Sequence, residues 1–150
     1  MTLKQVSVFI ENTYGRLCAI IKVLADNSID IRALSMADTT NYGILRMMVD
    51  DPAKAINILN DAGFAASLTD VIGVSIGDRP GGLYATLETL AKNGISVEYM
   101  YAFTEAEPGF AYVVLRIEDT EKAERILTDQ GIQILDKSVL TKKAAGEINE

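Results

Sequence analysis

Two short polar turns in the sequence hold residues that suit the binding of a small zwitterion. Each turn combines a polar side chain with glycine just before a predicted helix: Asn12 with Gly15, and Asp78 with Gly81 and Gly82. The N–H groups at a helix N-terminus attract a carboxylate, and Asn or Asp can accept hydrogen bonds from an ammonium group. Because glycine has no side chain, a ligand can approach this backbone closely.

The same residues also have a purely structural interpretation. Asn12 and Asp78 can cap their helices through a side-chain oxygen, and the glycines can simply form the turns. Asp30, which follows the first helix, is either a further charge offered to a ligand from a partner domain or an ordinary surface acid. The residue types alone leave both interpretations open.

No residues for acid–base or metal chemistry stand out. The sequence has no histidine and one cysteine, Cys18. Histidine is the commonest general base and metal ligand, and Cys18 has no histidine to activate it. We therefore expect no catalytic residue, no metal, no cofactor and no enzymatic activity, and we interpret Cys18 as a packing residue.

Composition and charge narrow the classes of protein further. The chain has 150 residues, of which 49% are hydrophobic and 23% charged, with a formal net charge of −7. An acidic surface repels phosphate backbones, so nucleic-acid binding is not expected. The sequence has no stretch near the length of about 20 apolar residues that a membrane span needs, and its start lacks the features of a signal peptide. These observations predict a cytoplasmic globular protein.

The chain repeats itself with an offset of about 66 residues, which grows to about 68 after a small insertion. The repeat places Val8 over Val74, Gly15 over Gly81, Leu17 over Leu83, Leu24 over Leu90, Asn27 over Asn93, Gly43 over Gly109, Lys54 over Lys122 and Gly63 over Gly131. These matches fall on apolar and glycine positions, which define a fold. The repeat predicts one domain over residues 1–69, a second over 70–140, and a polar tail over 141–150.

Each copy has the pattern strand, helix, strand, strand, helix, strand. The predicted strands cover residues 4–10, 29–37, 44–49 and 64–68 in the first copy, and 72–76, 95–103, 112–117 and 132–135 in the second. In the first helix Leu17, Ile20 and Leu24 share one apolar stripe. Asp51 and Asp119 are expected to cap the second helix of each copy. This order predicts an α+β, ferredoxin-like fold, with an antiparallel four-stranded sheet and two helices on one face.

The segments around the turns resemble the ACT domain. The second copy has Pro80-Gly81-Gly82-Leu83 between a strand and a helix, whereas the first has Tyr14 in place of the proline. The segments after each helix, Asn27-Ser28-Ile29-Asp30-Ile31 and Asn93-Gly94-Ile95-Ser96-Val97, are also similar to those of ACT domains. The resemblance covers nearly the whole chain, twice.

This resemblance implies a regulatory, allosteric module that binds an amino acid at the interface between ACT domains. The loop before the helix contacts the ligand from one domain, and the start of the second strand contributes from the neighbour. Carried onto this sequence, the ligand-binding residues are Asn12, Thr13, Tyr14, Gly15, Arg16, Leu17, Asp30, Ile31, Asp78, Arg79, Pro80, Gly81, Gly82, Leu83, Ser96 and Val97. The expected partners are a free amino acid, further copies of the chain in a homodimer or higher homo-oligomer, and a metabolic enzyme or other regulator.

The outer face of the sheet favours assembly. The resemblance implies an irregularity after Ile31 and Val97 that turns Leu34, Met36, Met100 and Ala102 toward the core. In the second copy the residues Tyr99, Tyr101, Phe103 and Tyr112 then lie on the outer face, where they form an interface. An alternative function is therefore an assembly or scaffold protein that uses ACT pairs for oligomerisation and binds no ligand.

Overall fold

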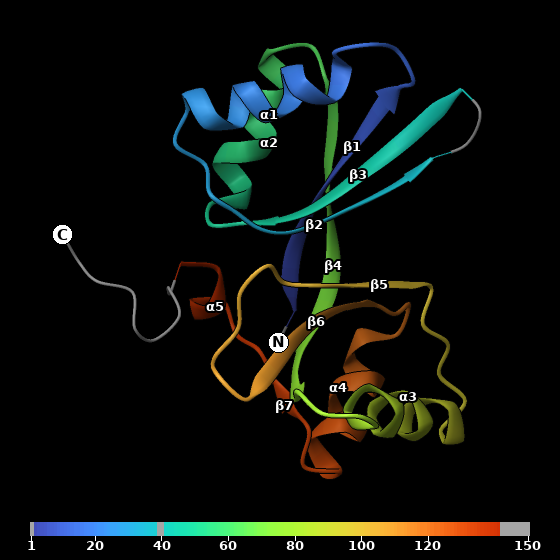
Figure 1. Cartoon of the computed structure of the whole chain (residues 1–150). Helices are drawn as coiled ribbons and strands as arrows, with labels where there is room; N and C mark the ends of the chain where they lie inside the picture. Colours follow the sequence, from blue (N-terminus) through green and yellow to red (C-terminus); the bar gives the residue numbers. More distant parts are fainter. Residues whose placement is uncertain (1, 39–40, 142–150) are drawn as a thin grey trace, which may run out of the picture. The chain divides into compact units, whose positions relative to one another are not determined.

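The computed structural model describes residues 2–38 and 41–141 of the chain (Figure 1). The chain divides into two compact units, one formed by Lys4–Thr69 and the other by the residues from Asp70 onward together with Thr2 and Leu3. The predicted polar tail, 141–150, lies outside the described residues except for Thr141.

The first unit is an antiparallel sheet with two helices. Its elements are β1 (Leu3–Glu11), α1 (Arg16–Asp26), β2 (Ile31–Asp38), β3 (Tyr42–Val49), α2 (Pro52–Asp61) and the first part of β4 (Ala65–Gly77). The strand order is β2-β3-β1-β4. Figure 1 shows α1 and α2 side by side on one face of this sheet.

Alternating side chains of the strands form the core of the first unit against these helices. Val6 and Val8 of β1 are buried with Leu45 of β3, while Ile20 of α1 and Leu59 of α2 close the core from the helix side. This is the period-2 strand and the amphipathic helix that the sequence pattern predicts.

The second unit repeats the same architecture. Its elements are the second part of β4, α3 (Gly82–Lys92), β5 (Tyr99–Ala102), β6 (Phe110–Arg116), α4 (Thr120–Asp129), β7 (Gln133–Ile134) and the short α5 (Ser138–Thr141). The strand order is β5-β6-β4-β7. Its core joins Ile72 and Val74 of β4 to Leu90 of α3 and Leu127 of α4. The predicted fold, two ferredoxin-like units in tandem, is confirmed.

The predicted helix caps are also confirmed. The carboxylate of Asp51 accepts a hydrogen bond of 3.1 Å from the N–H of Lys54, and Pro52 occupies the first turn of α2. Asp119 accepts a bond of 3.1 Å from the N–H of Lys122 at the start of α4. None of the helices among the described residues is long and apolar enough to cross a membrane.

The strands predicted over 64–68 and 72–76 form one element, and Leu3 groups with the second unit. β4 is continuous from Ala65 to Gly77, so the last strand of the first unit runs directly into the first strand of the second. Leu3, expected in the first domain, belongs with the second unit. The reason is a packing contact: a Cβ atom at Gly73 would lie 3.0 Å from Leu3 Cδ1 and 3.1 Å from Leu135 Cδ1, so both leucines cover this glycine.

The expected irregularity in the second strand is present in β2. The register between β2 and β3 shifts between Ile31 and Ala33, after which Leu34 lies opposite Met47 and Met36 opposite Leu45. Leu34 and Met36 therefore face the helix side, as predicted, but they remain 45% and 42% exposed. β2 is an edge strand, and the side chains of an edge strand have neighbours on one side only.

Candidate ligand-binding site

The two turns that precede α1 and α3 have the same backbone hydrogen bonds. In the first turn Thr13 N–H donates to Glu11 O at 2.9 Å, and in the second Arg79 N–H donates to Gly77 O at 2.9 Å. The N–H that opens each helix donates three residues back, at 3.5 Å from Arg16 and 3.1 Å from Gly82. The predicted repeat therefore extends to the detailed geometry of these turns.

A left-handed glycine begins each helix. Gly15 has φ 80° and Gly81 has φ 88°, and neither helix has a side-chain cap. Gly15 and Gly81 occupy the N-cap positions, so Asn12 and Asp78, which lie three positions earlier, are not the N-cap residues of α1 and α3. A helix start with no side-chain cap leaves N–H groups open to a ligand.

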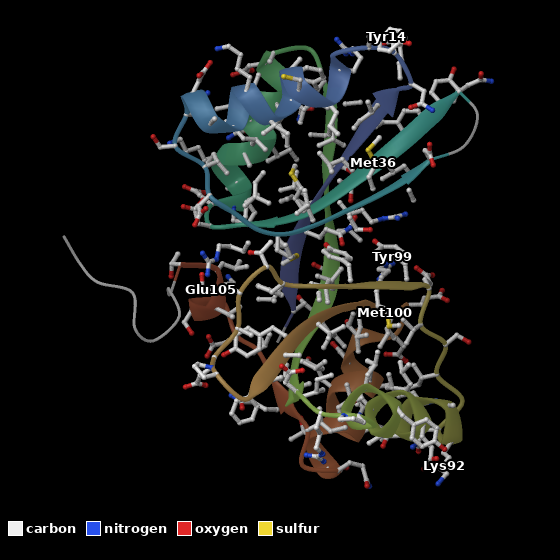
Figure 2. All side chains as sticks on the ribbon, viewed as in Figure 1. Tyr14, Met36, Lys92, Tyr99, Met100 and Glu105 are labelled. Carbon is white, nitrogen blue, oxygen red and sulfur yellow. The ribbon has the colours of Figure 1, made fainter. Side chains whose placement is uncertain are left out.

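The turn residues differ in their exposure. Most of the predicted turn residues are exposed, namely Asn12, Thr13, Tyr14, Gly15, Leu17, Asp78, Arg79, Pro80 and Gly81. Tyr14 extends furthest and its side chain points away from the first unit (Figure 2). Leu83 is half-buried and Gly82 is buried. The turns are therefore exposed surfaces. A ligand bound there also needs contacts from residues outside the turn.

Arg16 and Gly82 occupy equivalent positions with different chemistry. The guanidinium carbon of Arg16 lies 4.7 Å from the ring centroid of Phe64, a cation–π contact within the first unit. A Cβ atom at Gly82 would lie 2.3 Å from the carbonyl oxygen of Gly77. The second turn thus admits only glycine here, whereas the first turn carries a cation at the helix start.

Within one unit, the turn and the start of the second strand do not meet. Ser96 and Val97 follow the C-terminal end of α3, whereas the turn precedes its N-terminal end. α3 has 11 residues, which at about 1.5 Å per residue gives a length of about 16 Å. A ligand that contacts both regions needs them from different units, as the resemblance implies.

Asp30 is engaged inside its own unit. Its carboxylate forms a 3.1 Å ion pair with Arg32, whose side chain is only 7% exposed. Its N–H donates to the carboxylate of Asp50 at 3.0 Å. Ile31 packs against the first core. Asp30 is therefore more than a surface acid, and its partner Arg32 was missed, although two charges of opposite sign at i and i+2 on a strand share one face.

Ser96 lines a pocket in the second unit. The pocket has a volume of about 260 Å³ and is lined by Gly94, Ile95, Ser96, Glu98, Ile117, Glu118, Asp119 and Lys122. Val97 packs against the second core instead of lining the pocket. Sequence reasoning missed Glu98, Glu118 and Lys122, because they come from two segments that only the folded sheet brings together.

The predicted aromatic residues lie on one face of the second sheet. Tyr99 is opposite Arg116 and Tyr101 is opposite Val114 in the β5–β6 pairing. The rings of Phe103 and Tyr112 meet edge-on, with centroids 6.0 Å apart. Figure 2 labels Tyr99 on β5 together with its neighbour Met100. That these residues form an interface stays a prediction.

The first unit carries an aromatic pair that sequence reasoning missed. The rings of Phe9 and Tyr42 lie 5.2 Å apart. Both side chains are about half exposed, at 51% and 49%. The alternation along β1 places Phe9 on the outer face of the sheet. Only the register between β1 and β3 brings its ring next to that of Tyr42.

The pKa shifts near the second turn concern side chains on the surface of α3. The hydroxyl of Tyr84 donates a hydrogen bond to Glu88, which lowers the pKa of Glu88, with a further contribution from Lys92. The same hydrogen bond raises the pKa of Tyr84. These groups form a ladder at i, i+4 spacing along the helix. Among the described residues, no group of three or more Cys, Asp or Glu side chains could hold a metal ion.

Proteins of known structure share this architecture. The protein BT0572 from Bacteroides thetaiotaomicron matches with 39% sequence identity and a TM-score of 0.89, over 95% of this chain and 98% of that chain. The ligand-free regulatory subunit of aspartate kinase from Thermus thermophilus matches with 19% identity and a TM-score of 0.63, over 84% of this chain and 91% of that chain. The regulatory subunit of aspartate kinase from Thermus flavus matches with 20% identity and a TM-score of 0.58, over 84% of this chain and 90% of that chain. At these identities the Thermus subunits show a shared fold alone.

A comparison with curated proteins gave no match. The family model described as an ACT domain pair, in contrast, matches residues 1–144, which include both units, both glycine turns and the pocket. The chain therefore belongs to the ACT domain pair family.

Proposed function

We propose that this chain is a regulatory protein that binds a free amino acid at its helix-opening turns and has no catalytic activity of its own. The main support is that α1 and α3 both begin at a left-handed glycine with no side-chain cap. The positive end of a helix suits the carboxylate of an amino acid. Asn12 and Asp78, in the same turns, offer oxygen atoms to its ammonium group.

The rest of the proposed site comes from a neighbouring ACT unit. Asp30 and Ile31, or Ser96 and Val97, lie at the far end of the first helix of their own unit, so they serve a ligand bound at the turn of another unit. This arrangement predicts a homodimer or higher homo-oligomer that works in the cytoplasm. The amino acid then acts as an allosteric signal to a metabolic enzyme or another regulator.

A second candidate function is assembly without a ligand. The exposed aromatic pair Phe9 and Tyr42 favours it, because large exposed apolar side chains often mark protein–protein contacts. This function predicts an oligomer whose stability and size do not respond to amino acids.

A matched pair of glycine variants tests the amino-acid site. Gly81→Ala places a methyl group at the start of α3, whereas Gly131→Ala places one after α4; both residues have positive φ, 88° and 77°, and open space around them. Each variant bears a similar backbone strain of about 1 to 2 kcal/mol. Isothermal titration with the amino acid that most stabilises the wild-type chain should show at least a tenfold loss of affinity for Gly81→Ala only. Equal affinities in both variants would place the ligand elsewhere.

A further inference from the structure

The pocket of the second unit lies at the opposite end of α3 from the glycine turn. One side is the connection from α3 to β5, which supplies Gly94, Ile95 and Ser96, followed by Glu98. The other side is the junction of β6 and α4, which supplies Ile117, Glu118, Asp119 and Lys122. All of these residues belong to one compact unit, so the pocket needs no second unit to complete it.

Two opposite charges in this pocket have no partner within the chain. Among the described residues, the carboxylate of Glu118 and the Nζ atom of Lys122 form neither a hydrogen bond nor an ion pair. Asp119 is occupied, because its carboxylate accepts the N–H of Lys122 as the cap of α4. Glu98 is held at one oxygen by Arg116, at 3.3 Å from its Nε. The pocket therefore presents an exposed carboxylate and an exposed ammonium group, neither of which has a partner in the described part of the chain.

In the first unit, the residues equivalent to Lys122 and Glu118 form hydrogen bonds within the chain. Lys54, the counterpart of Lys122, donates from Nζ to the carbonyl oxygen of Asn27 at 2.8 Å. Asp50, the counterpart of Glu118, accepts the N–H of Asp30 at 3.0 Å. The two charges that have no partner in the described part of the second unit thus have counterparts that bond to the chain in the first.

A buried cation completes this arrangement in the first unit. Arg32 pairs with Asp30 at 3.1 Å, and its side chain is 7% exposed. In the second unit the equivalent positions hold Glu98 and Ser96, so both the arginine and its aspartate are missing. Glu98 pairs instead with Arg116 of β6, so the guanidinium group of the second unit comes from a different strand.

We propose that this pocket binds a small zwitterion, with its ammonium group at Glu118 and Glu98 and its carboxylate at Lys122. A volume of about 260 Å³ lies just below the usual range of about 300 to 1,000 Å³ for ligand pockets, so the ligand is no larger than a single amino acid. The inference rests on the proposed function for its ligand class, but it assigns a further molecule of that ligand to a second site, built within the second unit and separate from the glycine turns.

Charge-removing variants in the two units test the pocket. Lys122→Met and Glu118→Gln remove the two charges that face the pocket, and Lys54→Met and Asp50→Asn make the same changes in the first unit. Each of the twenty amino acids is first tested as a stabiliser of the full chain in a thermal-shift assay, and the best one is titrated into all variants by calorimetry. We expect the wild type to bind at two sites, with at least a tenfold loss of affinity at one of them for Lys122→Met and Glu118→Gln, and less than a twofold change at either site for the two variants of the first unit.

The ligand's own charges give an independent readout. The amide of the same amino acid, which lacks the carboxylate, should bind the wild type and Lys122→Met with equal, weak affinity. Unchanged binding of the amino acid by Lys122→Met and Glu118→Gln, together with its loss in Gly81→Ala, would overturn the pocket and leave the proposed function intact. If no amino acid binds the wild-type chain, both the pocket and the proposed function fail.

Discussion

At the scale of single residues, the two glycine turns have the same hydrogen bonds but tolerate different side chains. The first turn has Arg16 at the start of its helix, with its guanidinium group over the ring of Phe64. The second turn has Gly82, whose missing Cβ would overlap the backbone oxygen of Gly77. Two equivalent positions are therefore not interchangeable, because the second turn is closed more tightly by its own backbone.

This difference predicts a large effect of Gly82→Ala. The new Cβ would lie 2.3 Å from the oxygen of Gly77, and a backbone atom cannot move aside as a flexible side chain can, so we expect a loss of about 3 kcal/mol in the free energy of unfolding. Gly94→Ala is the control, because it has φ 72° but no atom within 4 Å, and it should lose only about 1 kcal/mol. Urea denaturation measures both, and equal losses would mean that the turn relaxes without cost.

At the scale of the elements, the stability of α4 depends on the charged residues at its two ends. Asp119 caps its first turn, with Glu121 also in that turn. Both charges interact favourably with the positive end of the helix. Asp129, in contrast, ends the same helix at its negative end.

These positions predict opposite effects for two aspartates of one helix. Asp119→Ala removes the hydrogen bond to the N–H of Lys122 and should lower the free energy of unfolding by about 1 kcal/mol. Asp129→Ala removes a charge from the unfavourable end of the helix and should leave stability unchanged or raise it by a few tenths of a kcal/mol, on the order of 0.3 kcal/mol. Thermal denaturation of both variants at low salt checks the contrast; an equal decrease would rule out capping as the cause.

Local sequence patterns predicted the elements better than their ends. The alternation of Val6, Val8 and Ile10 and the aspartate caps act over a few residues, and the structure has them as expected. The strand predicted over 95–103 is shorter, at Tyr99–Ala102. Ile95 and Val97 pack against the core from outside the strand, and apolar alternation alone does not distinguish such a segment from a hydrogen-bonded one.

The candidate sites were predictable to a different extent. The glycine turns could be found because each is contiguous in sequence and repeats. The pocket could not, because Glu98 and Lys122 meet only through the pairing of β5 with β6 and the direction in which α4 leaves the sheet. The ion pair of Asp30 with Arg32 and the aromatic pair of Phe9 with Tyr42 likewise depend on side-chain directions and strand register.

At the scale of the whole molecule, the chain is two copies of one fold whose charged groups have diverged. In the first unit, the charged side chains of Arg32, Asp50 and Lys54 all bond to other groups of that unit. The second unit leaves a carboxylate and an ammonium group facing a pocket. The two copies thus differ in whether these charged side chains bond to the chain, and we propose that a ligand binds where they do not.

The most direct test of amino-acid binding is a thermal-shift measurement on the full chain with each of the twenty amino acids at about 10 mM. A ligand at a concentration of 100 times its Kd adds about 2.7 kcal/mol to the stability of the folded state. For a chain of 150 residues, at about 2 to 4 °C per kcal/mol, that corresponds to a rise in Tm of about 5 to 11 °C. We expect such a rise with one amino acid or a chemically related few. An unchanged Tm with all twenty would contradict amino-acid binding and favour the assembly function.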